Sequence, residues 1–206
     1  MAHPSSPECP EPRGRRKPAA SRAQILEAVQ ALILSEGVDG VTIRRVSEGC
    51  GYSAPTIYHH FGDKNGLIDA VLEERFQEAF AVMSAIPKGD DPQRYLREMA
   101  RAFVAFALAN PDHYQLLSTP RLARADDVPS AEATRELVKG ALKELAESGR
   151  LATRSIETAY QVTWVALHGL ISLSLIRPNY DFDEDLVETT LDVMEAGLMP
   201  RGSSAS

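Results

Sequence analysis

The stretch GVDGVTIRRVSEGCGYSAPTIYHHFGDKNGL, residues 37–67, decides the fold of this chain. Thr42 is a good N-cap for a short helix whose inner face carries Val46, and the glycines at 49 and 51 break that helix. Ser53 is a good N-cap for a second short helix, because Pro55 falls in its first turn, where amide hydrogens have no intrahelical partners. Two short helices joined by a glycine-containing turn are typical of a helix-turn-helix, here at roughly 42–61.

Helical periodicity continues on both sides of this stretch. Before it, a capping box at Ser21 and Gln24 opens a helix that Gly37 closes; after it, Asp63 caps a long helix that Pro87 ends. The remaining helices are expected at 92–109, around 114–117, at 130–148, up to 176 and through 187–198, with a loop at 118–129. No segment alternates as a strand does, so the sequence predicts an all-α fold of about nine helices.

Composition and charge distribution set the domain organisation. Hydrophobic residues make up 44% and charged residues 25%, as in ordinary soluble domains. The net charge of −7 is uneven: residues 1–64 hold eight basic and seven acidic side chains, and residues 65–206 hold fourteen and twenty-two. We expect a disordered basic N-terminal arm at 1–18, a DNA-binding domain at 19–79, a C-terminal ligand-binding and dimerisation domain at 80–200, and a disordered tail at 201–206.

The N-terminal arm carries five basic residues and no acidic one between positions 13 and 22. Screening confines charge interactions to about 8 Å at physiological salt, so such an arm can hold phosphates although the body is acidic. The alternative interpretation is a solvated, disordered charge run. Cys9 and Cys50 suggest neither a disulfide framework nor a metal site, and the absence of an apolar leader favours the cytoplasm.

The second short helix carries the polar side chains that a DNA-reading helix needs. Ile57 and Phe61 are four residues apart and can both face inward, which leaves the hydroxyls and imidazoles of this helix outside. Thr42, Arg44 and Lys64 lie at helix starts, where side chains and free amides suit phosphate. The alternative is a helical hairpin packed purely for stability, but such a hairpin has no reason to expose a tyrosine and two histidines in a row.

The segment 37–67 resembles the DNA-binding part of the TetR/AcrR (tetracycline-repressor-like) regulator family. The resemblance rests on Gly40-Val41-Thr42, Val46, the turn at Gly51, and TIYHHF at 56–61 followed by Lys64 and Leu67. It departs from the family at Ser47, where alanine is usual, and at Gly62 and Gly66, which we expect to loosen the entry to the next helix. The resemblance implies a homodimer that contacts DNA through Thr42, Arg44, Arg45, Ser53, Ala54, Pro55, Thr56, Tyr58, His59, His60 and Lys64.

The run TAYQVTWVALHGLISLSLI, residues 158–176, contains no charged residue. Its length borders on a membrane span, but its polar residues and unbiased flanks favour a helix buried in protein, between a pocket and a dimer partner. Trp164, His168 and Gly169 are similar to the signature of a branch with a WHG-type C-terminal domain. We expect a mostly apolar effector pocket lined by Met99, Phe103, Phe106, Tyr114, Tyr160, Trp164, His168 and Ile171, although any of these residues suits a plain core equally well.

The last predicted helix carries an apolar stripe of Val187, Leu191, Met194 and Leu198, which fits either a dimer surface or plain core. No phosphate loop, nucleophile elbow or metal-ligand spacing is present, so no enzymatic activity, cofactor or metal is expected. The sequence predicts a transcription regulator, most simply a repressor that binds a palindromic operator as a homodimer and is released by a small apolar or amphipathic effector. The alternative is a helical enzyme or ligand-binding protein without regulated DNA binding.

Overall fold

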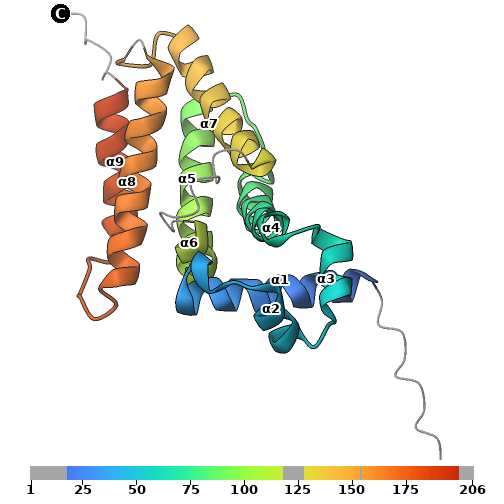
Figure 1. Ribbon diagram of the computed structural model, residues 1–206. Coiled ribbons are helices and arrows are strands. Elements are labelled where there is room, and N and C mark those ends of the chain that lie inside the picture. The colour runs from blue at the N-terminus through green and yellow to red at the C-terminus, as the bar shows by residue number, and fades with distance from the viewer. Residues whose placement is uncertain (1–17, 118–127, 154, 200–206) are drawn as a thin grey trace, which may run out of the picture.

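The computed structural model describes residues 18–117, 128–153 and 155–199, and in these ranges the chain is helical, without strands (Figure 1). The all-α prediction is therefore confirmed. The predicted tail at 201–206, Cys9, most of the loop at 118–129 and the predicted arm at 1–18, except Pro18, lie outside the described residues. The elements are α1 (Pro18–Glu36), a 3-10 turn η1 (Val38–Gly40), α2 (Ile43–Cys50), α3 (Ala54–Phe61), α4 (Lys64–Ser84), α5 (Pro92–Ala109), α6 (Pro111–Leu117), α7 (Pro129–Glu147), α8 (Ile156–Ile176) and α9 (Leu186–Leu198).

Two helix starts differ from the sequence-based expectation. The first helix begins at Pro18, three residues before the capping box that we expected to open it, because a proline is tolerated in a first turn. The helix expected from Ser130 begins at Pro129, again with proline at its first position. Elsewhere the caps act as predicted, since Thr42, Ser53 and Asp63 each accept a hydrogen bond from a backbone amide of the helix that they precede.

The N-terminal helices α1 to α3 and the first half of α4 share one hydrophobic core. Ile25 and Leu26 of α1, Val46 of α2, Ile57 of α3 and Leu67 of α4 have no exposed surface. Leu116 of α6 and Val128, just before α7, complete this core although they are distant in sequence. Figure 1 shows α1 lying across the base of the molecule beneath α5 and α6, with α2 and α3 below and beside it.

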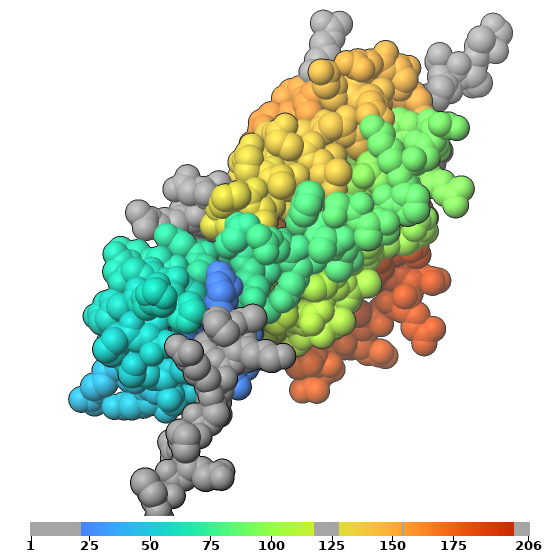
Figure 2. Space-filling view, turned by 90° about the vertical axis from the view of Figure 1, so that its right-hand side faces the viewer, coloured from blue at the N-terminus to red at the C-terminus, as the bar shows by residue number. Residues whose placement is uncertain are grey.

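The C-terminal body is built from α5, α7, α8 and α9, and its core is separate from the N-terminal one. Figure 1 shows α8 and α9 side by side along one edge, with α5 between them and α4. Figure 2 shows an elongated molecule, with the N-terminal helices at one end and the end of α7 at the other. The boundary expected between 79 and 80 falls inside α4, which is a single continuous helix that belongs to both cores.

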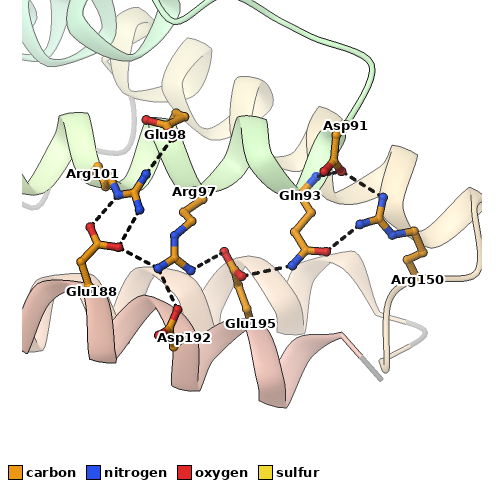
Figure 3. Close-up of polar contacts among 9 residues, drawn as sticks. All are labelled: Asp91, Gln93, Arg97, Glu98, Arg101, Arg150, Glu188, Asp192 and Glu195. Atoms are coloured by element: carbon orange, nitrogen blue, oxygen red, sulfur yellow. Dashed lines mark hydrogen bonds and ion pairs between the residues drawn. The ribbon is translucent and has the colours of Figure 1, made fainter. Parts of the chain in front are cut away.

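A network of ion pairs fastens α9 to α5 (Figure 3). The guanidinium of Arg97 on α5 lies 2.7 Å from carboxylate oxygens of Glu188 and Asp192, and 3.1 Å from Glu195, all on α9. Arg101, one turn further along α5, also donates to Glu188 at 2.6 Å. The adjacent arginines hold the pKa of Glu188 down at about 2. The network therefore fixes the register of α9, whose apolar side closes the body.

Candidate nucleic-acid interface and internal cavity

The first short helix, α2, is bounded by its own sequence. Thr42 Oγ1 accepts the amide of Arg45 at 3.3 Å, and Gly51 ends the helix with a left-handed φ of 71° that residues with a side chain adopt at a cost. The hydroxyl of Ser47, where the family usually has alanine, donates to the carbonyl of Tyr52 at 2.6 Å. The substitution at 47 therefore leaves no unpaired hydroxyl and adds a bond across the turn between α2 and α3.

The second short helix, α3, presents its polar side to solvent. Ile57 is fully buried, while Tyr58 is 52% exposed and His59 is exposed as well. Ser53 Oγ lies 2.9 Å from Thr56 Oγ1 and accepts the amide of Thr56, so these two hydroxyls form the cap of the helix. The side chains at Ala54 and Pro55, predicted DNA contacts like the others, lie in the first turn of α3. The outward face of α3 thus offers one phenol and one imidazole beside the cap.

Two adjacent arginines of α2 have different environments. Arg44 is largely exposed and lies 3.2 Å from Glu48, one turn along the same helix. Arg45 instead pairs through both terminal nitrogens with Glu36 of α1, and it donates to the carbonyl of Gly40 at 3.2 Å. Arg45 therefore braces α2 against α1, whereas Arg44 is available to a phosphate. Lys64, the other basic residue predicted at a helix start, is the first residue of α4.

The turn between α3 and α4 is tight, which corrects the expectation that its glycines loosen it. Gly62 has a φ of 77°, in the left-handed region. A Cβ at Gly66 would lie 2.2 Å from the carbonyl oxygen of Phe61, far inside van der Waals contact, and the amide of Gly66 donates to Asp63 Oδ1 at 2.9 Å. Glycine at 66 is what lets the end of α3 contact the first turn of α4, so α3 and α4 are held as one unit.

A cavity of about 600 Å³ that is partly open to solvent lies in the C-terminal body, lined by α4, α5, α6, α7 and α8. Six of the eight residues predicted for an effector pocket line it, and Trp164 is half-exposed there. Met99 and Ile171 do not; both are buried in the cores on either side of α5, because helical spacing alone does not say which side of a buried helix meets a cavity. The predicted residues in the lining are Phe103, Phe106, Tyr114, Tyr160, Trp164 and His168.

Sequence reasoning missed the contributions of α4 and α7 to the cavity. Phe76, Ala79 and Met83 enter from α4, and Ala131, Thr134, Arg135 and Val138 enter from α7. The spacing of three and four residues in both sets signals one face of a helix, but nothing in the sequence indicates that these faces meet. The presence of α4 is the important addition, because the same helix carries the buried residues that support α3.

The polar groups of the cavity gather around His168. The Tyr114 hydroxyl lies 3.0 Å from His168 Nδ1 and 2.9 Å from Ser172 Oγ, and it lies 3.2 Å from the His168 carbonyl. The rings of Trp164, Phe103 and Tyr114 surround the imidazole at centroid distances of 4.8, 5.5 and 5.5 Å. Burial among these rings lowers the pKa of His168 to about 4, so the imidazole is neutral at physiological pH.

Polar contacts tie α4 to its neighbours at the level of the cavity. Arg75 of α4 is buried, donates from Nε to Gln30 Oε1 of α1 at 2.8 Å, and pairs with Glu78. Glu73 of α4 accepts the hydroxyl of Ser130 at 2.6 Å and its amide at 3.2 Å, so it caps the first turn of α7 from outside. A displacement of α4 would therefore change its contacts with both the N-terminal core and α7.

The outer face of α8 exposes an apolar stripe of Val162, Val165, Leu173 and Ile176, here called the α8 stripe. In contrast, Leu191 and Leu198 of the stripe expected on the last helix are buried in the protomer, and Val187 and Met194 pack against the core. The plain-core alternative therefore applies to that stripe. Among the described helices, α8 also has the length and composition of a membrane span, with 22% of its most apolar window buried. In the described ranges no group of three or more His, Cys, Asp or Glu side chains is placed to hold a metal.

A capped helix-turn-helix is joined through α4 to a helical body that contains a cavity. This combination defines the class of helical DNA-binding transcription regulators. A family profile described as bacterial regulatory proteins, tetR family, matches residues 25–71. A second, described as tetracyclin repressor-like, C-terminal domain, matches residues 96–196. The chain belongs to the TetR family and is a DNA-binding regulator of transcription, not an enzyme. Whether it falls in the WHG-type branch stays a prediction.

Relatives and solved structures agree with this assignment. The HTH-type transcriptional repressor AcnR of Corynebacterium glutamicum is 29% identical over 164 residues, which cover 76% of this chain and 82% of that protein. A TetR-family regulator from Shewanella superposes with a TM-score of 0.76 at 17% identity, over 88% of this chain and 99% of the other. FadR from Bacillus subtilis, solved in complex with stearoyl-CoA, gives a TM-score of 0.71 at 16% identity, over 85% and 98%.

Proposed function

We propose that the protein is a homodimeric repressor in the cytoplasm that binds a palindromic operator through α2 and α3 of each protomer and leaves it when an effector fills the cavity. The observation that carries the proposal is that the helix-turn-helix and the cavity share α4. Leu67 and Leu72 of α4 are buried in the core beneath α3, and Phe76 and Met83 of the same helix line the cavity.

The DNA-binding half of the proposal rests on the exposed face of α3. A recognition helix reads base edges with side chains near its N-terminus, while side chains and amides at nearby helix starts hold phosphates. Tyr58 and His59 occupy the first role, and Thr42, Arg44 and Lys64 occupy the second. We propose Arg45 as a positioning residue, since its guanidinium is engaged by Glu36.

The dimer follows from the α8 stripe. Four aliphatic side chains on one face of a helix that carries no charge after Glu157 are costly to leave in water, and a second copy of the same helix can cover them about a two-fold axis. Two recognition helices about 34 to 36 Å apart then enter successive major grooves, which accounts for a palindromic operator. Pairing of α8 with a second copy also accounts for its apolar composition without a membrane.

Release by an effector follows from the position of α4. A molecule in the cavity contacts Phe76, Ala79 and Met83 of α4, and Phe76 also packs against the N-terminal core. If the effector binds better when the two recognition helices are wrongly spaced, it shifts the population toward that form, and operator DNA opposes it by the same factor. The repressor assignment is supported by the names of relatives such as AcnR.

Binding to DNA flanking the protein's own gene tests this proposal. Footprinting and gel-shift titration should show a protected palindrome, with affinity falling steeply as salt rises, because phosphate contacts release counterions. Tyr58→Ala should weaken binding by about tenfold or more, as loss of a base or backbone contact costs about 1 to 3 kcal/mol. Tyr180→Ala is the matched control, because Tyr180 is a comparably exposed tyrosine that lies between α8 and α9.

Two results would contradict the proposal. Affinity that is equal for Tyr58→Ala and the unchanged protein would place the DNA surface elsewhere. Absence of any protected sequence would favour the alternative of a helical ligand-binding protein without regulated DNA binding. The cavity is the observation that supports this alternative.

A further inference from the structure

The charged side chains around the cavity are few and already paired. Among the described lining residues, Arg135 carries the only charge, and its guanidinium pairs with Glu132, one turn earlier on α7. No carboxylate is present in the described part of the lining. An ion that leaves water for this space would find no unopposed counter-charge there, and burying an unpaired charge costs several kcal/mol. The lining thus disfavours both cationic and anionic ligands.

The polar corner at His168 is built from neutral groups. The Tyr114 hydroxyl, which is also hydrogen-bonded to Ser172, occupies Nδ1 of the ring, so Nε2 is the ring nitrogen that a ligand can meet. A neutral imidazole has one donor and one acceptor nitrogen, and whichever form is present, Nε2 can make one hydrogen bond. A hydroxyl suits both forms, because it donates and accepts, while a carbonyl suits the form in which Nε2 carries the proton.

The surroundings of this corner are apolar. Trp164 and Phe103 flank the imidazole, and aliphatic or aromatic side chains from the five helices around the cavity make up most of the remaining lining. A volume of about 600 Å³ lies within the range of cavities that enclose drug-sized ligands. The space therefore fits a molecule with a large apolar body and one polar end.

We propose that the effector is an uncharged, largely apolar molecule that places a single hydroxyl or carbonyl group against His168. The inference rests on the proposed function, because it names the ligand class of the same cavity. Tyr114 acts as a positioning residue: its hydroxyl holds the imidazole in the orientation that receives the ligand.

The single tryptophan of the chain gives a direct measurement. Trp164 lines the cavity beside His168, so its fluorescence reports on occupancy without a label. Titration at about pH 7.5 with decan-1-ol, decanoate and decylammonium compares three ligands that share one apolar chain and differ in the charge of the polar end. Decan-1-ol should bind at least about tenfold more tightly than either ion, since each ion loses hydration that the lining does not replace.

Substitutions separate the polar corner from the rest of the cavity. Tyr114→Phe should weaken decan-1-ol binding by about tenfold and leave the weak binding of the two ions unchanged, because only the alcohol uses the oriented imidazole. His168→Leu carries the same test if Tyr114→Phe does not fold. Tyr180→Phe is the control, because it removes the hydroxyl of an exposed tyrosine that does not line the cavity, and it should leave decan-1-ol binding unchanged.

Three outcomes would overturn the proposal: decanoate or decylammonium binding as tightly as the alcohol, decan-1-ol binding that Tyr114→Phe does not weaken, or no change in Trp164 fluorescence with any of the three ligands. Operator binding is measured on the same samples without ligand. Loss of operator binding counts against the proposed function, whereas intact operator binding with the wrong ligand preference counts against this inference alone.

Discussion

At the scale of single residues, His168 shows how burial changes the chemistry of a side chain. In an unfolded chain its imidazole takes up a proton near pH 6.5, but in the folded protein the surrounding rings lower its pKa to about 4. Between these values the unfolded state binds more protons than the folded state. The contribution of His168 to stability is therefore complete above about pH 6.5 and is lost as the pH falls toward 4.

This proton linkage predicts a pH-dependent stability. Between about pH 7.5 and pH 5, the free energy of unfolding should fall by about 2 kcal/mol through His168 alone. His168→Gln should remove this share of the pH dependence, measured by urea denaturation at the two pH values. His59→Gln is the control, because His59 is exposed on α3 and lies outside the cavity. Equal pH dependence of the His168→Gln variant and the unchanged protein would refute the prediction.

At the scale of elements, ion pairs decide how α9 sits on α5. Arg97 is largely buried and meets three carboxylates of α9, so its charge is shared among side chains on successive turns (Figure 3). Isolated surface pairs contribute little, because water competes for both ions, but a network around one buried guanidinium holds its geometry at a lower entropic cost. From the sequence alone, these charged residues cannot be distinguished from solvated charges on two separate amphipathic helices.

Replacing Arg97 by methionine tests the network. Met keeps most of the apolar stem but leaves Asp192 without its cation, so we expect a loss of about 1 to 2 kcal/mol of stability, between the values for exposed and buried pairs. The measurement is urea denaturation at low and high salt, and the difference should shrink at about 1 M salt. Lys143→Met removes an exposed pair with Glu147 on α7 and should change stability by less than about 0.5 kcal/mol. An equally small effect at Arg97 would show that apolar packing alone holds α9.

At the scale of the whole molecule, the α8 stripe is the feature that the protomer does not explain by itself. Val165 and Ile176 are 61% and 74% exposed, and of the four residues in the stripe only Val165 also lines the cavity. A dimer across this face would set the separation of the two helix-turn-helix units. Operator affinity and protomer association should therefore be linked.

A charge placed in the α8 stripe tests this link. Leu173→Asp should convert the dimer to a monomer in sedimentation velocity, because an unpaired carboxylate in an apolar interface costs several kcal/mol, and Leu173 does not line the cavity. Operator affinity should fall with it, while the unfolding of the protomer stays nearly unchanged. Leu108→Asp is the control, since Leu108 is an exposed apolar residue on α5, outside the stripe. A wild-type protein that sediments as a monomer, or a variant that remains dimeric, would remove the argument for a palindrome.

The helix-turn-helix was predictable from sequence because its determinants are local. The caps at Thr42, Ser53 and Asp63 each accept from the amide three residues further on, and the glycines at 51 and 62 supply left-handed turns within their own segment. Such short-range signals survive without knowledge of the rest of the fold. The aromatic part of the lining on α5, α6 and α8 was also predictable, because aromatic residues at helical spacing point to one face of a helix.

The tertiary structure alone decided which faces meet. Met99 and Ile171 have the spacing of pocket residues yet lie in cores, and Arg45 has the position of a phosphate contact yet is paired with Glu36 of α1. From the sequence, Gly66 suggested a loose turn, but a Cβ at this position would collide with the carbonyl of Phe61, so the turn is tight. These outcomes depend on how the helices pack against one another, whereas hydrophobic periodicity describes each helix separately. The sequence by itself determined the helices and their caps, whereas tertiary packing determined the cavity, its neutral polar corner and the exposed side of α8.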